Sequence, residues 1–214
     1  VGESWGSSSG DTWDDSVHAR RYGADGTPQA SSFQVNTYTP SYQNGVAISL
    51  DADGDFVVVW QSYGSSAGDS SDESIQGQRF SPAGVAQGAQ FQVNVYTTGP
   101  QKVPAVASDP DGDFVVVWRS DGSSGSDTFY GSIQAQRFSA AGTTSGEQFQ
   151  VNTYTTQVQS YPAVALSAAG DFVVAWESRG SSGGDTSNVS IQGQRWAAEG
   201  TPQGAQFQVN TFTT

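Results

Sequence analysis

The segment Asp113–Trp118, DFVVVW, is repeated letter for letter at Asp55–Trp60 and with one change, DFVVAW, at Asp171–Trp176. Successive side chains of a β-strand point to opposite faces. The aromatic residues and the middle valine of this segment therefore share one face, and the other two valines share the opposite face. A strand that is apolar on both faces is typical of one packed between two other layers. The segment predicts a buried central strand that recurs along the chain.

The rest of the chain repeats with the same period. The tetrapeptide FQVN begins at positions 58 residues apart, namely Phe33, Phe91, Phe149 and Phe207. This spacing divides the 214 residues into a partial unit one, 1–40, and three full units, two to four, at 41–98, 99–156 and 157–214. Self-similarity at a fixed period of this size is the signature of a solenoid, a propeller or a tandem array. We expect residues 1–214 to form a single repeat domain.

Each full unit predicts four antiparallel strands. In unit three these are Pro104–Ala107, Asp113–Trp118, Ser132–Phe138 and Gln148–Asn152. An Asp-Gly turn joins the first two strands, a polar loop joins the next two, and an Ala-Gly turn leads into the last. In the last strand we expect Val151 to face the core and Asn152 to face water, because the two side chains alternate.

The character of these strands changes in order along the unit. The first has small side chains, the second is apolar on both faces, and the fourth is half polar. In a propeller blade the inner strand is crowded near the axis, the second is covered by neighbouring blades, and the outer strand meets water. The sequence therefore predicts an all-β, β-propeller-like array of four-stranded antiparallel units. A β-solenoid and a tandem array of small sandwiches are the alternatives.

The ordered motifs of the unit resemble those of a known kind of repeat. FQVN followed by an aromatic residue and threonine, then PAVA, DxDGDFVVVW, GSS and IQGQRF, is similar to repeats of very large secreted or surface-attached bacterial proteins. These include adhesin-like proteins that also carry calcium-binding glycine-rich repeats. The resemblance covers essentially the whole chain. It implies a secreted or cell-surface location and an adhesive or structural role, and it implies no catalytic residues.

Charge and composition exclude several kinds of partner. The formal net charge is −13 and the only lysine is Lys102, so nucleic acid and anionic lipid surfaces would repel the chain. No apolar run is long enough for membrane insertion. The chain has no cysteine and no methionine. We therefore expect no disulfide framework, and we expect the sequence to be a processed product or part of a longer chain.

Two acidic turns are candidate calcium sites. Asp51, Asp53 and Asp55 form the pattern DADGD, and Asp109, Asp111 and Asp113 form DPDGD. The EF-hand pattern needs a glycine at its sixth position and a glutamate at its twelfth, and both are missing. The third copy, Ser167–Asp171, keeps only the last acidic residue, a loss that a turn tolerates and a metal site does not. We favour turn geometry with no obligate cofactor, with calcium binding as the alternative.

A polar residue pair recurs around the loop between the second and third strands. This glycine-rich loop ends in Asp11, Asp69, Asp127 and Asp185, and the third strand carries Arg21, Arg79, Arg137 and Arg195. The loop lacks the lysine and hydroxyl residue of a phosphate-binding loop. One interpretation is that each aspartate caps the loop backbone or pairs with the arginine. The other is that aspartate and arginine form a polar ligand pocket in every unit.

Aromatic residues vary in and around the same loop. They are Trp5, Trp13, Tyr63, Phe129 and Tyr130. Exposed rings can stack on the apolar faces of sugar rings, so these residues are candidate carbohydrate-binding groups. Single exposed aromatic residues are also ordinary on protein surfaces.

Catalysis has little support in the sequence. The only histidine, His18, stands where the other units have glutamine, and the carboxylates lie in polar turns rather than paired in a cleft. We therefore predict that the protein is no enzyme. We expect a non-catalytic extracellular or cell-surface protein, structural or adhesive, with carbohydrate as a candidate ligand. A propeller-type polysaccharide hydrolase or lyase is the alternative.

Unit one lacks the part of the repeat that would contain DFVVVW, because the first 18 positions of the unit are missing from it. Its third strand, Val17–Tyr22, would therefore present an unpaired edge, which is a template for pairing with another chain. We expect this edge to be covered by further repeats of a longer parent chain or by another copy of the protein. Contacts between copies that do not close into a ring would produce a filament.

Overall fold

The computed structural model describes residues 1–5, 15–65, 68–69, 72–123, 125–128, 130–180, 183–185 and 188–212. Over these residues the chain forms 15 strands and no helix, and so no helix that could cross a membrane. The strands are β1 (Gly2–Trp5), β2 (Asp15–Ala19), β3 (Phe33–Gln34), β4 (Gln43–Leu50), β5 (Phe56–Tyr63), β6 (Glu73–Phe80), β7 (Ala86–Gln92), β8 (Gln101–Ser108), β9 (Phe114–Asp121), β10 (Tyr130–Phe138), β11 (Phe149–Gln150), β12 (Gln159–Leu166), β13 (Phe172–Arg179), β14 (Val189–Trp196) and β15 (Phe207–Gln208).

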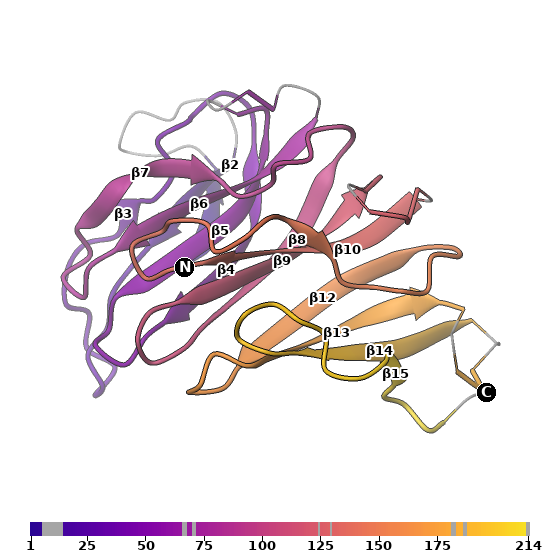
Figure 1. Cartoon of the computed structure of the whole chain (residues 1–214). Coiled ribbons are helices and arrows are strands. Elements are labelled where there is room, and N and C mark those ends of the chain that lie inside the picture. Colours follow the sequence, from indigo (N-terminus) through magenta and orange to yellow (C-terminus); the bar gives the residue numbers. More distant parts are fainter. Residues whose placement is uncertain are drawn as a thin grey trace.

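Each unit forms one antiparallel sheet, and successive sheets follow one another through the molecule (Figure 1). Units two, three and four are the four-stranded sheets β4–β7, β8–β11 and β12–β15, and unit one is the three-stranded sheet β1–β3. The first strands of neighbouring sheets lie side by side, β4 against β8 and β8 against β12. The prediction of an all-β, propeller-like array of four-stranded antiparallel units is confirmed.

The DFVVVW segment is a buried central strand wherever another unit covers it. In β5 and β9 every residue from the phenylalanine to the tryptophan is buried. In β13 burial alternates, so that Trp176 is buried while Val173 is 38% exposed. The two sides of the strand differ in unit four because unit three covers one side of its sheet and no described unit covers the other.

Two kinds of sheet face meet at each junction between units. We call one the valine face, which in unit two comprises Val57, Val59, Ile75 and Val93, and the other the aromatic face, which comprises Phe56, Val58, Trp60 and Phe80. The valine face of each of units one to three packs on the aromatic face of the next unit, which gives three separate apolar clusters. Within an aromatic face the rings stack, with centroids 5.0 Å apart for Phe56 and Phe80.

The tryptophan that ends each DFVVVW or DFVVAW segment donates a hydrogen bond to a glutamine of the neighbouring first strand. Trp118 Nε1 donates to Gln101 Oε1 at 2.9 Å, and the same bond joins Trp60 to Gln43 at 3.3 Å and Trp176 to Gln159 at 3.0 Å. The indole N–H is therefore satisfied in the core, as a buried polar group requires.

The expected orientation of Asn152 is wrong, because this side chain is buried rather than facing water. Its Oδ1 accepts the Ile133 amide at 2.8 Å, and its Nδ2 donates to Asp127 Oδ2 at 2.7 Å. Strict alternation fails here because β11 ends at Gln150, so Asn152 lies beyond the strand. Beyond the end of β11, the Asn152 side chain connects the chain to the third strand and to the loop.

The Asp-Gly turns close tight hairpins as predicted. The Asp51 amide donates to the Asp55 carbonyl at 3.0 Å, and the Gly54 amide donates to the Asp51 carbonyl at 3.3 Å. Gly54 has φ +85°, a conformation that glycine adopts without strain. A three-residue hairpin loop with glycine in this position is a common connection between antiparallel strands.

The predicted unpaired edge of unit one over Val17–Tyr22 is wrong for its first part, because β1 pairs with β2 through Val17 and His18 and leaves only the end of the third strand open. β2 pairs with β1 only from Asp15 to His18, whereas β6 pairs with β5 along its whole length. Beside this edge lies a hollow of about 420 Å³, whose apolar lining includes Tyr22, Ile48 and Leu50. What covers the edge, another copy or a further repeat, stays a prediction.

Candidate functional site

The strands of every unit share two ends, which carry different residues. We call the end with the Asp-Gly turns, such as Asp51–Asp55, the turn face, and the opposite end, where the chain leaves β5 at Gly64 and enters β6 at Glu73, the loop face. The acidic turns and the recurring arginines lie at the turn face. The described recurring aspartates, Asp69, Asp127 and Asp185, and the described aromatic candidates lie at the loop face, and Asp11 lies outside the described residues.

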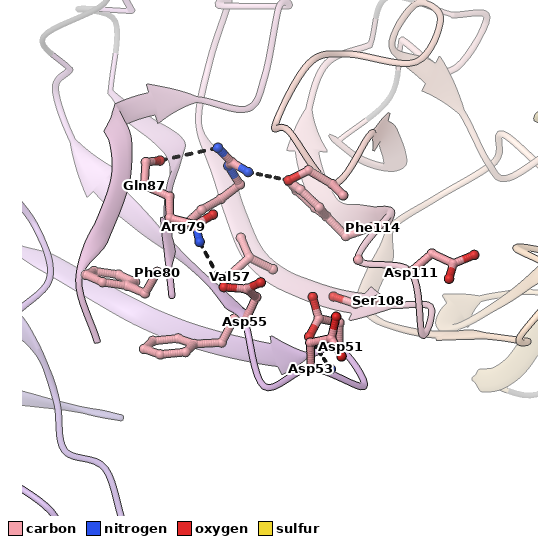
Figure 2. Close-up of a pocket in the computed structure, with 13 residues that line it drawn as sticks. Asp51, Asp53, Asp55, Val57, Arg79, Phe80, Gln87, Ser108, Asp111 and Phe114 are labelled. Atoms are coloured by element: carbon pink, nitrogen blue, oxygen red, sulfur yellow. Dashed lines mark hydrogen bonds between the residues drawn. The ribbon is translucent and has the colours of Figure 1, made fainter. Parts of the chain in front are cut away.

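A crevice opens at the turn face between successive units. Between units two and three it has a volume of about 100 Å³ and is lined by the acidic turn, by Arg79 and Gln87, and by Asp111 of the next unit (Figure 2). The corresponding crevice between units three and four has a volume of about 300 Å³ and is lined by Arg137. These crevices are lined by positively and negatively charged side chains, but several of these side chains form hydrogen bonds with other residues of the protein.

The recurring arginine of units one, two and three donates a hydrogen bond to the following unit. Arg79 donates from Nη1 to the carbonyl of Ala140, which lies in the turn after the third strand of unit three. Equivalent bonds join Arg137 Nη1 to the Ala198 carbonyl at 2.5 Å and Arg21 Nη1 to the Ala83 carbonyl at 2.7 Å. Because a charged donor strengthens a hydrogen bond, these contacts fix the spacing of the units at the turn face.

The acidic residues of the turns hold backbone N–H groups. Asp109 Oδ1 accepts the amides of Asp111 and Asp113 at 3.0 Å each, and Asp51 Oδ1 accepts the amide of Asp53 at 3.0 Å. In the copy without these carboxylates, Ser167 Oγ accepts the Ala169 amide at 3.3 Å. Serine can take this role because it forms the same kind of side-chain turn as aspartate.

The side chain of the last aspartate of each acidic turn accepts a hydrogen bond from a residue outside the turn. Asp55 Oδ1 accepts Gln87 Nε2 at 2.8 Å, and Asp113 Oδ1 accepts the Ala140 amide at 2.8 Å (Figure 2 shows the first). These carboxylates thus take part in the geometry of the turns and their surroundings, and the expectation of no obligate cofactor stays a prediction. Within the described part of the chain, no three His, Cys, Asp or Glu side chains gather closely enough to hold a metal ion.

Of the interpretations offered for the recurring aspartate, which were capping of the loop backbone, pairing with the arginine and a shared ligand pocket, the pairing is wrong. Asp69, Asp127 and Asp185 are buried, and their Oδ2 atoms accept the amide nitrogen of the FQVN asparagine at 2.8, 2.7 and 2.9 Å. The arginines lie at the other end of the third strand, at the turn face. The two groups therefore form no common ligand pocket, and the buried aspartate holds the loop against the fourth strand.

Aromatic side chains do gather at the loop face. Tyr63 packs on Tyr42 with ring centroids 5.2 Å apart, and Tyr130 is 73% exposed. Burial raises the pKa of the Tyr42 phenol, and the nearby negative charge of Glu73 adds to this shift. Of the other aromatic candidates, Trp13 and Phe129 lie outside the described residues, and Trp5 is described only as part of the β1 backbone.

The sequence analysis missed Tyr161, which is 62% exposed at the loop face. It occupies the same place as Gly45 and Val103, and all three have positive φ angles, +64°, +53° and +50° in chain order. A register shift in β4, β8 and β12 marks a β-bulge there. A positive φ is strained for valine and tyrosine, so the bulge imposes this conformation whichever residue stands there. Comparing the residues at this position in units two, three and four would have singled out Tyr161.

Charged residues also lie at the loop face, and they differ between units. Lys102 Nζ of unit three pairs with Glu73 Oε1 of unit two at 3.2 Å. In unit three Arg119 binds Asp121 Oδ1 through both Nε and Nη2, at 2.9 and 2.7 Å. Paired charges and exposed tyrosines together give this end of the molecule a mixed polar and aromatic surface.

Comparison with known proteins gives similar solved structures at low sequence identity. No protein-family model and no curated protein matches the chain. A protein of unknown function from Dyadobacter fermentans has a similar solved structure, with a TM-score of 0.54, 15% identity, and coverage of 85% of this chain and 45% of its own. An α-L-arabinofuranosidase from Lactobacillus brevis has a TM-score of 0.49 at 13% identity, with coverages of 82% and 58%. An endo-1,4-β-xylanase from Bacteroides thetaiotaomicron has a TM-score of 0.47 at 8% identity, with coverages of 84% and 63%. The chain thus spans 45–63% of the length of these structures.

Proposed function

We propose that the chain is a non-catalytic repeat scaffold of a secreted or cell-surface protein, and that its loop face binds carbohydrate. One contrast carries this proposal. Most side chains that recur between units bond within their own unit or to a neighbouring one, whereas many side chains that change from unit to unit lie at the loop face, where some, such as Lys102, also bond across a junction. A repeated framework with one varied surface suits a binding or adhesive module, because stacked repeats create extended binding surfaces.

The framework contacts are the same at all three junctions. The glutamine just before FQVN accepts a backbone N–H of the preceding unit: Gln90 from Thr37 at 2.8 Å, Gln148 from Val95 at 2.7 Å and Gln206 from Thr153 at 2.8 Å. The arginine bonds at the turn face repeat in the same way. Side chains that hold a junction together are occupied, so they are poor candidates for catalytic groups.

The varied positions lie at the ends of the first and second strands. At four of them the residues of units two, three and four are Asn44, Lys102 and Ser160; Gly45, Val103 and Tyr161; Gln61, Arg119 and Glu177; and Tyr63, Asp121 and Arg179. In the second strand, by contrast, the DFVVVW segment differs at one position only. Units two and three have valine at that position, and unit four has Ala175. Variation at the loop face therefore changes the surface without changing the packing.

The chemistry of this surface favours a neutral sugar chain. A tyrosine ring offers an apolar face to a sugar ring and a hydroxyl group to its hydroxyls. The exposed Tyr63, Tyr130 and Tyr161 come from three successive units, so an extended ligand could contact several of them. The net charge of −13 disfavours polyanionic glycans for the same reason that it disfavours nucleic acid.

A glycan array probed with the purified chain tests this proposal, followed by a reducing-sugar assay on every polysaccharide that binds. Binding of a neutral glycan without release of reducing ends supports a non-catalytic module. Release of reducing ends would replace it with the propeller-type hydrolase, and failure to bind any neutral glycan would contradict the ligand class.

Matched tyrosine variants locate the binding surface. Tyr130→Ala and Tyr161→Ala are expected to weaken binding roughly 3–10-fold each, the factor that corresponds to an aromatic contact of about 0.5–1.5 kcal/mol. Tyr22→Ala is the control, because Tyr22 is 57% exposed but lies at the turn face of unit one. Equal losses in all three variants would show that the loop face is not the binding surface.

A further inference from the structure

The valine face of unit four is an interaction surface without a partner in the described structure. Val115 of unit three is 3% exposed, and its equivalent Val173 of unit four is 38% exposed. Val151 is 1% exposed, and its equivalent Val209 is 50% exposed. These residues are the same in both units, so the difference comes from what covers them. In units one to three the cover is always the aromatic face of the next unit.

A charged group at this surface also lacks its partner. Arg137 of unit three donates to the carbonyl of Ala198 in unit four. Arg195 is its equivalent, and its guanidinium makes no hydrogen bond to any other residue that the structure describes. The group that would accept this bond lies, at every other junction, in the turn after the third strand of the following unit.

Two further groups of unit four repeat this pattern. Glu3 and Gln61 accept the bulge amide of the following unit through Oε1, at 2.7 and 3.1 Å, and Glu177 occupies the same position with no such amide beside it. The Thr153 amide of unit three donates to Gln206 of unit four at 2.8 Å. Its equivalent, the Thr211 amide, has no glutamine acceptor among the described residues.

The shape and chemistry of this surface specify its partner. It needs an aromatic face, a turn carbonyl, a bulge amide and a glutamine side chain, and all of these belong to the full repeat unit. Among the residues that the structure describes, the one aromatic-side face left uncovered in a second copy is that of unit one, which does not offer this set of groups. That face carries His18, Arg20 and Tyr22, with Arg20 over the Tyr22 ring at 5.7 Å, and lacks the tryptophan strand.

We propose that the valine face of unit four docks the aromatic face of a further full unit of the same repeat. The docked unit takes the position that unit four takes on unit three. Its turn carbonyl accepts from Arg195 and its bulge amide donates to Glu177. This inference concerns the end of the array and does not depend on carbohydrate binding at the loop face.

A cysteine-reactivity experiment tests the docking, since the chain has no cysteine of its own. Val173→Cys is placed in the 214-residue chain and in an extended protein that repeats residues 41–98 after Thr214. Val115→Cys is the buried control and Val85→Cys the exposed control. In the 214-residue chain Cys alkylation at position 173 is expected to be fast. In the extended protein it is expected to be ~10-fold slower or more, which an interface worth about 1.4 kcal/mol produces.

Arginine variants of the extended protein refine the result. Arg195→Ala is expected to restore part of the reactivity at position 173, and Arg20→Ala, at the exposed face of unit one, to leave it unchanged. Position 173 reacting as fast as position 85 in the extended protein, whether or not the added unit folds, would overturn the proposal. Protection of position 173 in the 214-residue chain that grows with concentration, with a dimer in sedimentation, would also overturn it, since the partner would then be a second copy.

Discussion

Val115 and Val173 occupy the same position of the repeat, so replacing each by alanine measures what a following unit contributes to stability. Each change removes the equivalent of two CH₂ groups, or about 1.6 kcal/mol of transfer free energy when the side chain is fully buried. Val115 lies in the cluster with Phe172 and Trp176, where a cavity would remain, so we expect Val115→Ala to cost about 2 kcal/mol in total. Val173 is 38% exposed and no described unit packs on it, so Val173→Ala is expected to cost less than about 1 kcal/mol.

Urea denaturation of both variants, followed by tryptophan fluorescence and by circular dichroism, measures this difference. Two probes are needed because long repeat arrays can unfold in more than one step. The comparison holds if the slopes with urea are equal and only the midpoints move. Equal losses for the two variants would refute the reasoning, because they would mean that the neighbouring unit does not bury Val115 in solution.

Four other outcomes follow from the packing and the hydrogen bonds. Trp118→Ala is expected to cost about 3–5 kcal/mol, the range for a buried aromatic side chain, and a variant as stable as the natural chain would remove the tryptophan from the core. Trp196→Phe is expected to be neutral or stabilising, because Trp196 Nε1 is buried with no hydrogen-bond partner in the described structure and the other full units have phenylalanine there; a lower urea midpoint would contradict this. Burial raises the pKa of Tyr42 in the folded state, so its contribution to stability is complete below the unfolded pKa of about 10 and is lost as the pH rises through the folded value. The natural chain should therefore lose stability more steeply than Tyr42→Phe above about pH 10, with Tyr161→Phe as the control. A chelator should leave the melting temperature unchanged, and a fall of many degrees that calcium reverses would mean that the acidic turns bind metal.

The fold could be predicted because the decisive signals lie within one unit. A strand that is apolar on both faces has to be covered on both sides, so it predicts a central buried strand. Its recurrence every 58 residues predicts the number of sheets. The hairpin turns followed from Asp-Gly and Ala-Gly pairs for the same reason. The orientation of Asn152 could not be read in this way, since alternation holds only while the strand continues, and β11 ends two residues earlier.

The partners at the candidate site were harder to predict, because most of them belong to another unit. Every pair of recurring residues has the same spacing in each repeat, so the sequence does not say whether Arg79 meets a group of its own unit or of the next. The structure shows that Arg79 donates both to the Gln87 carbonyl of its own unit and to the Ala140 carbonyl of the next. The role of Asp69 was missed because its asparagine partner comes from the far end of the same unit.

The three repeated junctions bear on how such a chain can change over generations. The bonds from arginine to the turn carbonyl and from the backbone amide to glutamine join only adjacent units. Recombination that duplicates or deletes one whole period of the gene would therefore join two compatible surfaces at the new boundary, and no other part of the protein would have to adapt. Mutations at the loop face could then diversify each duplicate separately, since those positions lie outside the junction cores.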